Sequence, residues 1–366
     1  MNMAEQRAKY EIIVDWIQDR LEDYRINGNS KIESENELAA IFSVSRQTVR
    51  HAIFVLERKG ILEKKRGSGT FIKEAAVSEV EQQRTMRIGI ITTYVDEYIF
   101  PPIIREMEMV LAKAGYSIQI AFTHNSIETE RTILTNILKN TEVDGIIAES
   151  VKGGLPSPNL HLYERLKEKG MPIIFINSYY ETLHVPHVSM NDSLAGKMAT
   201  EHLIQCGHVK IGGIFKSDDG QGKLRYLGYI EALLEAKMKV RSDQVAWVDT
   251  EDMRGNIEDF ARVLKRLCNC TACVCYNDEV ASKLVAICLA AGIKIPEELS
   301  IVGIDNSELA RLCEIPFTSI ENPIRDLGRN AATGIIELIK GKTLKERLEL
   351  EPRIVTRDSV KLIKPK

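Results

Sequence analysis

The run RQTVR at residues 46–50 carries side chains that suit contact with the edges of DNA bases. An arginine can donate two hydrogen bonds to guanine, and a glutamine can make a similar two-point contact with adenine. The turn KKRG at residues 64–67 is basic and tight, as contacts with phosphates or the minor groove require. The candidate DNA-binding residues from these two runs are Arg46, Gln47, Thr48, Arg50, Lys65, Arg66 and Gly67.

A second set of polar residues has the chemistry that a sugar ligand requires. Planar polar groups can hydrogen-bond pairs of hydroxyls, while an aromatic ring covers the apolar face of the sugar. At any single position the alternative is that an Asp or Asn after a strand caps the next helix. Polar residues of this kind, interleaved with Tyr and Phe, follow successive apolar runs. They lie at positions 92–100, 149–152, 177, 216–219, 225, 277–278 and 305–306.

The chain has seven cysteines, and four of them are crowded at positions 268, 270, 273 and 275. One C-x-x-C spacing lies within this group, but a structural zinc site usually pairs two such motifs across a longer spacer. The run Ala272–Tyr276 favours a buried strand, in which cysteine serves as a small hydrophobic residue. We therefore expect no disulfide, no metal site and no cofactor.

The elements that would position the first set form a helix-turn-helix followed by a hairpin. Apolar stripes predict helices over residues 10–21 and 46–59, and Ser34 with Glu37 forms a capping box at the start of a short helix between them. Two short helices joined by a tight turn can place the second helix in the major groove. Residues 61–72 predict a β-hairpin, the wing of a winged helix.

The sequence SENELAAIFSVSRQTVRHAIFVLERKGILEKKRGSGTFI resembles the winged-helix head of the GntR family, and the resemblance covers nearly all of residues 5–73. One departure is Glu33, which stands where a proline usually precedes the Ser-Glu pair. An extra acid near the DNA backbone would change affinity or sequence preference. The resemblance implies DNA contacts at Asn36, Arg46, Gln47, Thr48, Arg50, Arg66 and Gly67, with Glu35 and Lys9 as further candidates.

From Met86 onward, apolar strand-like runs alternate with helical segments, which predicts βαβ units and parallel sheets. Two such series predict two doubly wound lobes, and ligands bind outside the carboxyl ends of strands in such folds. The site should therefore lie in the cleft between the lobes. The expected strands are 87–91, 117–121, 143–147 and 172–176, followed by 210–214, 244–248, 272–276 and 299–304.

The fold class expected is α/β: an N-terminal winged helix-turn-helix joined to a two-lobed, doubly wound domain like that of periplasmic binding proteins. The expected domains are a DNA-binding head at residues 1–73, a linker at 74–85, and an effector-binding and dimerisation domain at 86–366. The linker is polar and lacks a strong apolar stripe.

Several segments of the second part resemble the effector domain of the lac/gal repressor family and the related periplasmic sugar-binding proteins. They include FINSYY at 175–180, RYLGYIEAL at 225–233, CYNDEVA at 275–281 and SIVGIDNSELA at 300–310. The hinge helix usual in that family is missing here, because the head is of another type. The resemblance implies effector contacts at Arg225, Asp278 and Asp305.

The pairing of the two parts, together with the segments ITTYVDEYIFPPIIREME and GIFKSDDGQGKLRY, resembles the arabinose-operon repressors of Gram-positive bacteria. On this resemblance the small sugar effector is L-arabinose, and Tyr94, Tyr98, Glu149 and Lys216 become candidate contacts. The full set of candidate effector-binding residues is Tyr94, Tyr98, Glu149, Lys152, Asn177, Lys216, Arg225, Asn277, Asp278 and Asp305.

Composition and absent motifs argue against other classes of function. The chain is 44% hydrophobic and 28% charged, with no apolar run near the roughly 20 residues that span a bilayer. The N-terminal segment has no secretory pattern, so we expect a cytoplasmic protein and not an exported transport receptor. Neither the phosphate-binding glycine loops nor the G-x-S-x-G and H-E-x-x-H motifs are present, so we expect no catalytic residues.

These features predict a repressor of sugar-utilisation genes that binds two operator half-sites as a homodimer. Sugar binding should close the lobes and misalign the two heads, so that the affinity for operator DNA falls. Two alternatives keep the same architecture: another neutral sugar acts as the effector, or a co-repressor promotes DNA binding.

Overall fold

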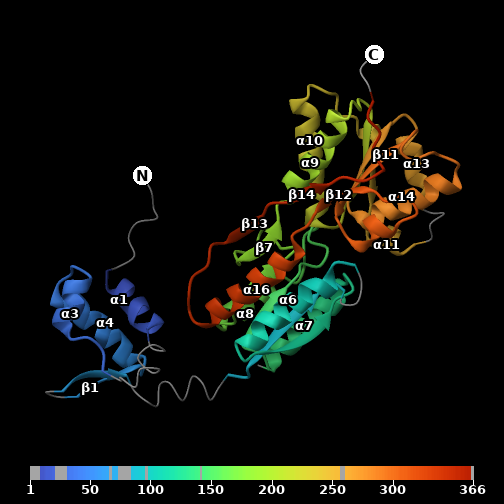
Figure 1. Cartoon of the computed structure of the whole chain (residues 1–366). Coiled ribbons are helices and arrows are strands. Elements are labelled where there is room, and N and C mark those ends of the chain that lie inside the picture. Colours follow the sequence, from blue (N-terminus) through green and yellow to red (C-terminus); the bar gives the residue numbers. More distant parts are fainter. Residues whose placement is uncertain are drawn as a thin grey trace. The chain divides into compact units, whose positions relative to one another are not determined.

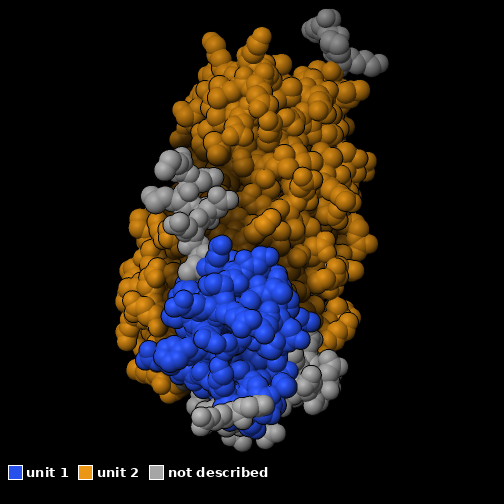
Figure 2. Space-filling view, turned by 90° about the vertical axis from the view of Figure 1, so that its left-hand side faces the viewer, with its two compact units in different colours: residues 1–85 blue, residues 86–366 orange. Residues whose placement is uncertain are grey.

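A computed structural model describes residues 9–20, 31–65, 68–72, 84–94, 98–140, 142–255 and 260–363 of the chain. Its contacts divide the chain into two compact units, residues 1–85 and residues 86–366, which are coloured separately in Figure 2. The predicted linker at 74–85 lies almost wholly outside the described residues.

The first unit is the predicted helix-turn-helix and hairpin (Figure 1). Ser34 accepts a hydrogen bond from the amide of Glu37, whose side chain bonds back to the amide of Ser34, so the capping box is confirmed. Ser45 caps the next helix through the amide of Thr48, and Gly60 after that helix has a φ of +75°. The elements are α1 (Lys9–Asp19), α3 (Glu35–Ile41), α4 (Arg46–Arg58), β1 (Leu62–Lys65) and β2 (Gly69–Ile72).

Apolar residues at helical spacing hold these elements together. Helix α4 buries Val49, Ala52, Ile53 and Leu56, which the sequence predicts as its inner face. They pack with side chains of α1, α3 and the hairpin in one cluster. The opposite side of α4 therefore stays available to solvent.

The first lobe of the second unit is a six-stranded parallel sheet in the order β13-β7-β6-β5-β3-β4. Its strands are β3 (Arg87–Thr92), β4 (Ser117–Phe122), β5 (Gly145–Ala148), β6 (Ile173–Ile176), β7 (His187–Met190) and β13 (Arg347–Leu350). Its helices are α6 (Phe100–Lys113), α7 (Ile127–Lys139), α8 (Leu160–Glu168) and α16 (Ile324–Ile339). We call this part lobe 1.

The second lobe is a six-stranded sheet in the order β14-β12-β11-β10-β8-β9, parallel except for the β12–β14 pair. Its strands are β8 (Ile211–Lys216), β9 (Val245–Val248), β10 (Ala272–Cys275), β11 (Ser300–Asp305), β12 (Thr318–Glu321) and β14 (Arg353–Val355). Its helices are α9 (Asp192–Gln205), α10 (Gly220–Glu235), α11 (Thr250–Arg254), α13 (Leu264–Leu267), α14 (Asp278–Ala290) and α15 (Glu308–Leu312), with short 3₁₀ turns at Ser242–Gln244 and Ala261–Val263. We call this part lobe 2.

The chain passes between the lobes three times: after β7, after β12, and between β13 and β14. The sequence predicts that one series of βαβ units forms the first lobe and the next series forms the second. This is wrong for the last part of the chain, because α16 returns to lobe 1 and packs against α6 and β6. Four strands were not predicted: β7, β12, β13 and β14. Among the described residues, no helix is both long and apolar enough to cross a bilayer.

Candidate functional site

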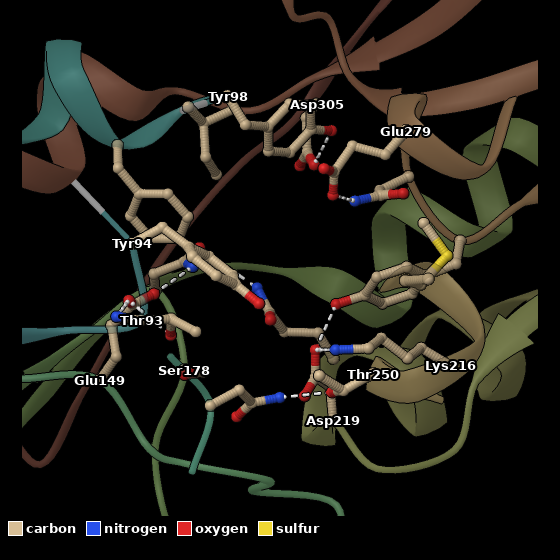
Figure 3. Close-up of a pocket in the computed structure, with 18 of the residues that line it drawn as sticks. Thr93, Tyr94, Tyr98, Glu149, Ser178, Lys216, Asp219, Thr250, Glu279 and Asp305 are labelled. Atoms are coloured by element: carbon tan, nitrogen blue, oxygen red, sulfur yellow. Dashed lines mark hydrogen bonds and ion pairs between the residues drawn. The ribbon is translucent and has the colours of Figure 1, made fainter. Parts of the chain in front are cut away.

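A cavity of about 730 Å³ lies between the two lobes. Its walls come from the residues just after β3, β5 and β6 in lobe 1 and from the ends of β8, β10 and β11 in lobe 2. The carboxyl ends of parallel strands meet at one edge of a sheet, so both sheets direct their strand-end residues into this space. Figure 3 shows side chains from both lobes turned toward the cavity.

The cavity brings together eight of the ten residues that the sequence indicated for effector binding. They are Tyr94, Tyr98, Glu149, Asn177, Lys216, Arg225, Asn277 and Asp305. The other two, Lys152 and Asp278, do not line it.

Glu149 is a buried acid that accepts four hydrogen bonds on the lobe 1 side. One carboxylate oxygen accepts hydrogen bonds from the hydroxyl of Thr92 at 2.7 Å and from the amide and hydroxyl of Thr93 at 2.8 and 3.0 Å. The other accepts from Asn177 Nδ2 at 2.7 Å. Burial raises the pKa of Glu149, while these hydrogen bonds lower it in part. The arrangement fixes both Glu149 and Asn177 in place before any ligand arrives.

Lys216, at the end of β8, faces the cavity from lobe 2. Its Nζ donates to Asp219 Oδ2 at 2.8 Å and lies 3.6 Å from Asp218 Oδ1. Tyr276 donates its hydroxyl to the same Asp219 oxygen at 2.9 Å. Burial alone would lower the pKa of Lys216, but the two carboxylates outweigh burial and raise it. The lysine is therefore a charged donor that already has its counter-ion.

Arg225, on α10, is 1% exposed and has three acceptors. Its Nε donates to Asp192 Oδ1 at 2.8 Å, its Nη1 to the carbonyl of Tyr276 at 2.6 Å, and its Nη2 to Asp305 Oδ1 at 3.4 Å. Burial disfavours the charged form of Arg225, but the neighbouring carboxylates raise its pKa overall. The guanidinium thus joins the start of α9 to the ends of β10 and β11.

Tyr98 links the lobes directly at the cavity wall. Its hydroxyl donates to Asp305 Oδ2 at 2.5 Å and accepts from the amide of Asp278 at 3.2 Å. Figure 3 shows the Tyr98 ring beside Asp305. Burial and the Asp305 carboxylate raise the pKa of Tyr98 well above its ordinary value, so it stays a hydroxyl donor.

The side chain of Asp278 points behind the cavity wall, contrary to the prediction that it contacts the effector. One carboxylate oxygen accepts from the amide and hydroxyl of Ser307 at 2.6 and 3.0 Å, and the other accepts from Ser319 Oγ at 2.6 Å. Burial and the nearby Asp305 raise the pKa of Asp278 to about 7. The neighbouring Asn277 lines the cavity and also caps α14, so it is both a candidate ligand contact and a helix cap.

Lys152 also differs from the prediction. It follows β5 by four residues, at a φ of +46°, and its amide donates to Asn125 Oδ1 at 2.8 Å. The turn carries its side chain out of the cavity lining.

Each base that lines the cavity has a carboxylate within ion-pair distance. Four acids and three bases line it: Glu149, Asp219, Glu279 and Asp305, with Lys216, Arg225 and Arg254. Lys216 forms an ion pair with the half-buried Asp219, Arg225 forms one with the buried Asp192, and Arg254 lies 3.8 Å from Glu251. Among the described lining residues, no base lacks a carboxylate partner. Such a wall suits a neutral polyhydroxylated molecule and offers no spare cation to a phosphate.

Most of the candidate DNA-binding residues that the structure describes are exposed on the head. Arg46, Gln47 and Arg50 are exposed in the first turns of α4, and Asn36 is exposed on α3. Thr48 is half-buried, and its hydroxyl lies 2.9 Å from that of Ser45. Two further candidates lie elsewhere on the head: Lys9 is exposed at the start of α1, and Lys65 ends β1 with its Nζ 2.9 Å from Glu63. Arg66 and Gly67 lie outside the described residues.

Glu35 connects three elements of the head. Its carboxylate accepts from Arg50 Nε at 2.7 Å and from Lys64 Nζ at 2.6 Å, joining α3 to α4 and β1. The bond from Lys64 and then that from Arg50 lower the pKa of Glu35. This acid therefore holds two cations of the exposed face in position.

Two family models match the chain. Residues 9–72 match the bacterial regulatory proteins of the gntR family, and residues 200–360 match the periplasmic binding protein-like domain. The arabinose metabolism transcriptional repressor of Halalkalibacterium halodurans is 36% identical over 362 residues, which cover 96% of each chain. That of Geobacillus stearothermophilus is 35% identical and covers 92% of this chain and 93% of its own.

The chain belongs to the family of the arabinose metabolism transcriptional repressors. It is a transcriptional repressor of sugar metabolism with a GntR head and an effector domain of the LacI type. Among solved structures, the transcription regulator CcpA of Lactococcus lactis matches with a TM-score of 0.68 and 26% identity, over 76% of this chain and all of that one. The relatives and this structural neighbour are transcription regulators.

Several residues lining the repressor's cavity were not among the sequence candidates. His124 and Asn125 follow β4, and Thr250 and Arg254 lie on α11 after β9. The sequence predicts both strands, and the same rule, that ligands meet the carboxyl ends of strands, applies to them. Applying it to these two outer strands would have found all four residues.

The cysteines of the repressor form no metal centre in the described part of the chain. Within it, no group of three or more His, Cys, Asp or Glu side chains is placed to hold a metal ion. Cys273 and Cys275 are fully buried in β10, so the predicted buried strand is confirmed.

Proposed function

We propose that this repressor binds the operators of sugar-utilisation genes and that L-arabinose, bound in the cleft between the lobes, releases it from DNA. The observation that carries the proposal is the polar cavity, whose bases already have carboxylate partners and which contains eight of the predicted effector residues. Both relatives are arabinose metabolism repressors, which supports this particular sugar.

The cleft offers hydroxyl partners of both kinds. Ser150 Oγ is buried and has no hydrogen-bond partner among the described residues, so it is available to a ligand hydroxyl. Asn177 and Glu149 supply acceptors on the same wall, and Arg225 supplies donors on the opposite one. The ring of Tyr94 packs edge-on against Phe100 at the cavity wall and offers an aromatic surface to the sugar.

A second candidate is a larger neutral sugar. The cavity of about 730 Å³ lies within the range of about 300–1,000 Å³ usual for small-molecule sites, and it exceeds what a single pentose fills. A pentose would share this space with water molecules.

On the DNA side, we propose that the repressor acts in the cytoplasm as a homodimer whose two heads contact operator half-sites. Residues at the start of α4 would meet base edges, and the wing would meet the backbone. The proposed DNA contacts are Lys9, Asn36, Arg46, Gln47, Thr48, Arg50, Lys65, Arg66 and Gly67, with Glu35 holding Arg50. In this mechanism the sugar-free cleft allows operator spacing of the heads, and the liganded cleft does not.

A thermal-shift screen identifies the effector directly. A ligand at 100 times its dissociation constant stabilises the folded state by about 2.7 kcal/mol. The panel is L-arabinose, D-xylose, D-ribose, D-galactose and L-arabinose 5-phosphate. We expect stabilisation by L-arabinose and none by the phosphate, and we expect L-arabinose to lower the fluorescence anisotropy of labelled operator bound to the repressor.

A pair of neighbouring variants tests the location of the site. Ser150→Ala removes an unpartnered hydroxyl from the wall and should weaken L-arabinose binding roughly fivefold without changing stability. Lys152→Ala, two residues along but outside the lining, is the matched control and should bind like wild type. Equal affinities for all three proteins would place the sugar elsewhere, and failure of every sugar in the panel would reject the proposed effector class.

A further inference from the structure

The three crossovers all lie toward one side of the effector domain. The crossovers follow β7, follow β12 and join β13 to β14, and these four strands lie at the same end of their two sheets. The edge strands at the opposite end are β4 in lobe 1 and β9 in lobe 2. The lobes are covalently joined on the first side and are free to separate on the second. Contacts at the β4–β9 side therefore decide whether the cleft stays closed.

A buried chain of hydrogen bonds crosses between the lobes at that free side. Asn125, just after β4, donates from Nδ2 to Thr250 Oγ1 at 2.7 Å. Thr250 in turn donates to Asp218 Oδ2 at 2.6 Å, and its amide donates to the same oxygen at 3.1 Å. These three side chains are 4%, 2% and 3% exposed. Polar groups at this depth satisfy one another only while the lobes are together.

Asn125 is prepared for this contact by its own lobe. The amide of Lys152 donates to Asn125 Oδ1 at 2.8 Å, which orients the amide group so that Nδ2 faces lobe 2. At the same wall, Arg254 of lobe 2 donates to the carbonyl of His124 at 2.5 Å.

The backbones of the two lobes also touch nearby, at Gly154. Its amide donates to the carbonyl of Asp218 at 3.0 Å, and its own carbonyl accepts from Lys223 Nζ. A Cβ on Gly154 would lie 2.9 Å from backbone atoms of Asp218 and Asp219, closer than real Cβ contacts. Only glycine permits this approach, and Gly154 does not line the cavity.

We propose that Asn125, Gly154, Asp218 and Thr250 form a clasp that holds the cleft closed and thereby sets the sugar concentration at which the repressor leaves its operator. The inference rests on the proposed function for its link to sugar and operator. Closure itself is a property of the lobes alone. Asn125 and Gly154 are positioning residues here, because they act through the position of the opposite lobe.

Gly154→Ala tests the clasp without altering a cavity residue. Its methyl group must push lobe 2 away, so L-arabinose should bind at least tenfold more weakly, while sugar-free repressor keeps its operator affinity within twofold. Gly220→Ala is the matched control: it lies on the lobe 2 side of the same contact, where a Cβ would be 3.6 Å from the carbonyl of Gly153, an ordinary distance.

Hydrogen–deuterium exchange provides a readout that needs no sugar. The Gly154 amide is bonded to the other lobe only while the lobes are together, so its exchange in the sugar-free full chain reports how often they close. Exchange at this amide should be at least twofold slower in wild type and in Gly220→Ala than in variants that open the clasp. Thr250→Val is the second such variant, since it removes the hydroxyl shared by Asn125 and Asp218 while keeping the shape.

The outcomes separate this proposal from the proposed function. Faster exchange in Gly154→Ala or Thr250→Val, with weaker L-arabinose binding, supports the clasp. Unchanged exchange in both, or unchanged sugar affinity in variants that exchange faster, overturns it. If wild type does not bind L-arabinose but the variants exchange faster than wild type as expected, the sugar assignment is rejected and the clasp is supported.

Discussion

Arg225 is almost completely buried, and its guanidinium meets acceptors on three different elements. Replacement by lysine keeps the charge but removes the planar fork, so one amine cannot reach Asp192, Asp305 and the Tyr276 carbonyl together. We expect Arg225→Lys to lower the free energy of unfolding of the effector domain by about 2–4 kcal/mol. L-arabinose affinity should fall at least roughly tenfold, about 1.4 kcal/mol.

Urea unfolding and calorimetric titration with L-arabinose measure the two effects of Arg225→Lys. The variant should still bind operator, because Arg225 belongs to the second unit and is not part of the head's own core. A variant with wild-type sugar affinity would show that Arg225 supports the fold and does not contact the ligand.

Asp278 makes stability depend on pH in an unusual direction for an acid. Its pKa is raised to about 7 by burial and by Asp305, so the folded state holds the proton more tightly than the unfolded state. Stability is therefore lost as pH rises from the unfolded pKa of about 4 toward 7. Asp278→Asn cannot ionise, and its free energy of unfolding relative to wild type should rise by about 2 kcal/mol between about pH 5 and pH 8.

Thermal unfolding of wild type and Asp278→Asn across this range checks the Asp278 prediction. Asp326→Asn, which changes an exposed carboxylate on α16, controls for the loss of charge alone. A constant difference between Asp278→Asn and wild type would contradict the upward shift.

Glu35 offers a test of positioning in the head. The ion pairs to Arg50 and Lys64 are largely exposed on the basic side, at 66% and 54%, so they add little to stability. Glu35→Gln should therefore leave thermal stability nearly unchanged. It should weaken operator binding about 5- to 30-fold because Arg50 is no longer held, while affinity for a scrambled duplex stays the same or rises. Anisotropy titrations on the operator and on the scrambled duplex measure both affinities. If both affinities rise equally, Glu35 acts by repelling the DNA phosphates and does not position Arg50.

At the scale of elements, helices α9 and α10 pack so closely that their backbones touch at two glycines. A Cβ on Gly196 would lie 2.0 Å from the carbonyl oxygen of Arg225, and one on Gly228 would lie 1.8 Å from that of Ser193. Helix α10 carries Arg225 and α9 begins with its partner Asp192, so this packing sets their 2.8 Å ion pair. The site's geometry thus depends on residues that contain no functional group.

Gly196→Ala should separate the two helices and displace Arg225 from Asp192. We expect a loss of about 1–3 kcal/mol in the free energy of unfolding, together with weakened L-arabinose binding. Gly89→Ala is the control, because that glycine is also buried but a Cβ there would meet only ordinary contacts from 3.6 Å outward. Gly196→Ala with wild-type sugar affinity would show that α9–α10 spacing does not set the site.

What the sequence predicts at this scale is mainly local. The capping box of Ser34 and the buried face of α4 depend on neighbours within a few residues, and both are confirmed. Strand β13 has the sequence RLEL with three exposed residues, so no apolar run marks it. The assignment of α16 to lobe 1 depends on where the chain crosses, which the helix's own pattern does not contain.

The same limit applies within the site. Glu149 and Lys216 end up in the cavity because a strand end fixes their place, so the pattern of strands predicts them. Asn277 and Asp278 are adjacent after one strand, yet only Asn277 faces the cavity. The difference arises from Ser307 and Ser319, which come from distant segments and bond Asp278 from behind. No local pattern could distinguish the two.

For the whole molecule, the effector domain can influence DNA only through a difference in the free energy of its states. The lobes are joined by the chain crossovers on one side and by hydrogen bonds on the other, so opening the cleft would break a defined set of contacts. In the proposed mechanism, a sugar that contacts both walls favours the closed arrangement, and an operator that requires one spacing of the heads favours another. Neither ligand need touch the other for the two equilibria to be coupled.

Thermodynamic linkage turns this coupling into the last prediction. If L-arabinose lowers operator affinity by some factor, saturating operator must lower L-arabinose affinity by the same factor, which we expect to be about 5- to 150-fold, or 1–3 kcal/mol. Calorimetric sugar titrations of the full-length repressor, free, saturated with operator and mixed with a scrambled duplex, measure it. The scrambled duplex should leave sugar affinity unchanged. Operator-bound and free repressor with equal sugar affinities would mean that the cleft does not govern DNA binding, whatever molecule occupies it.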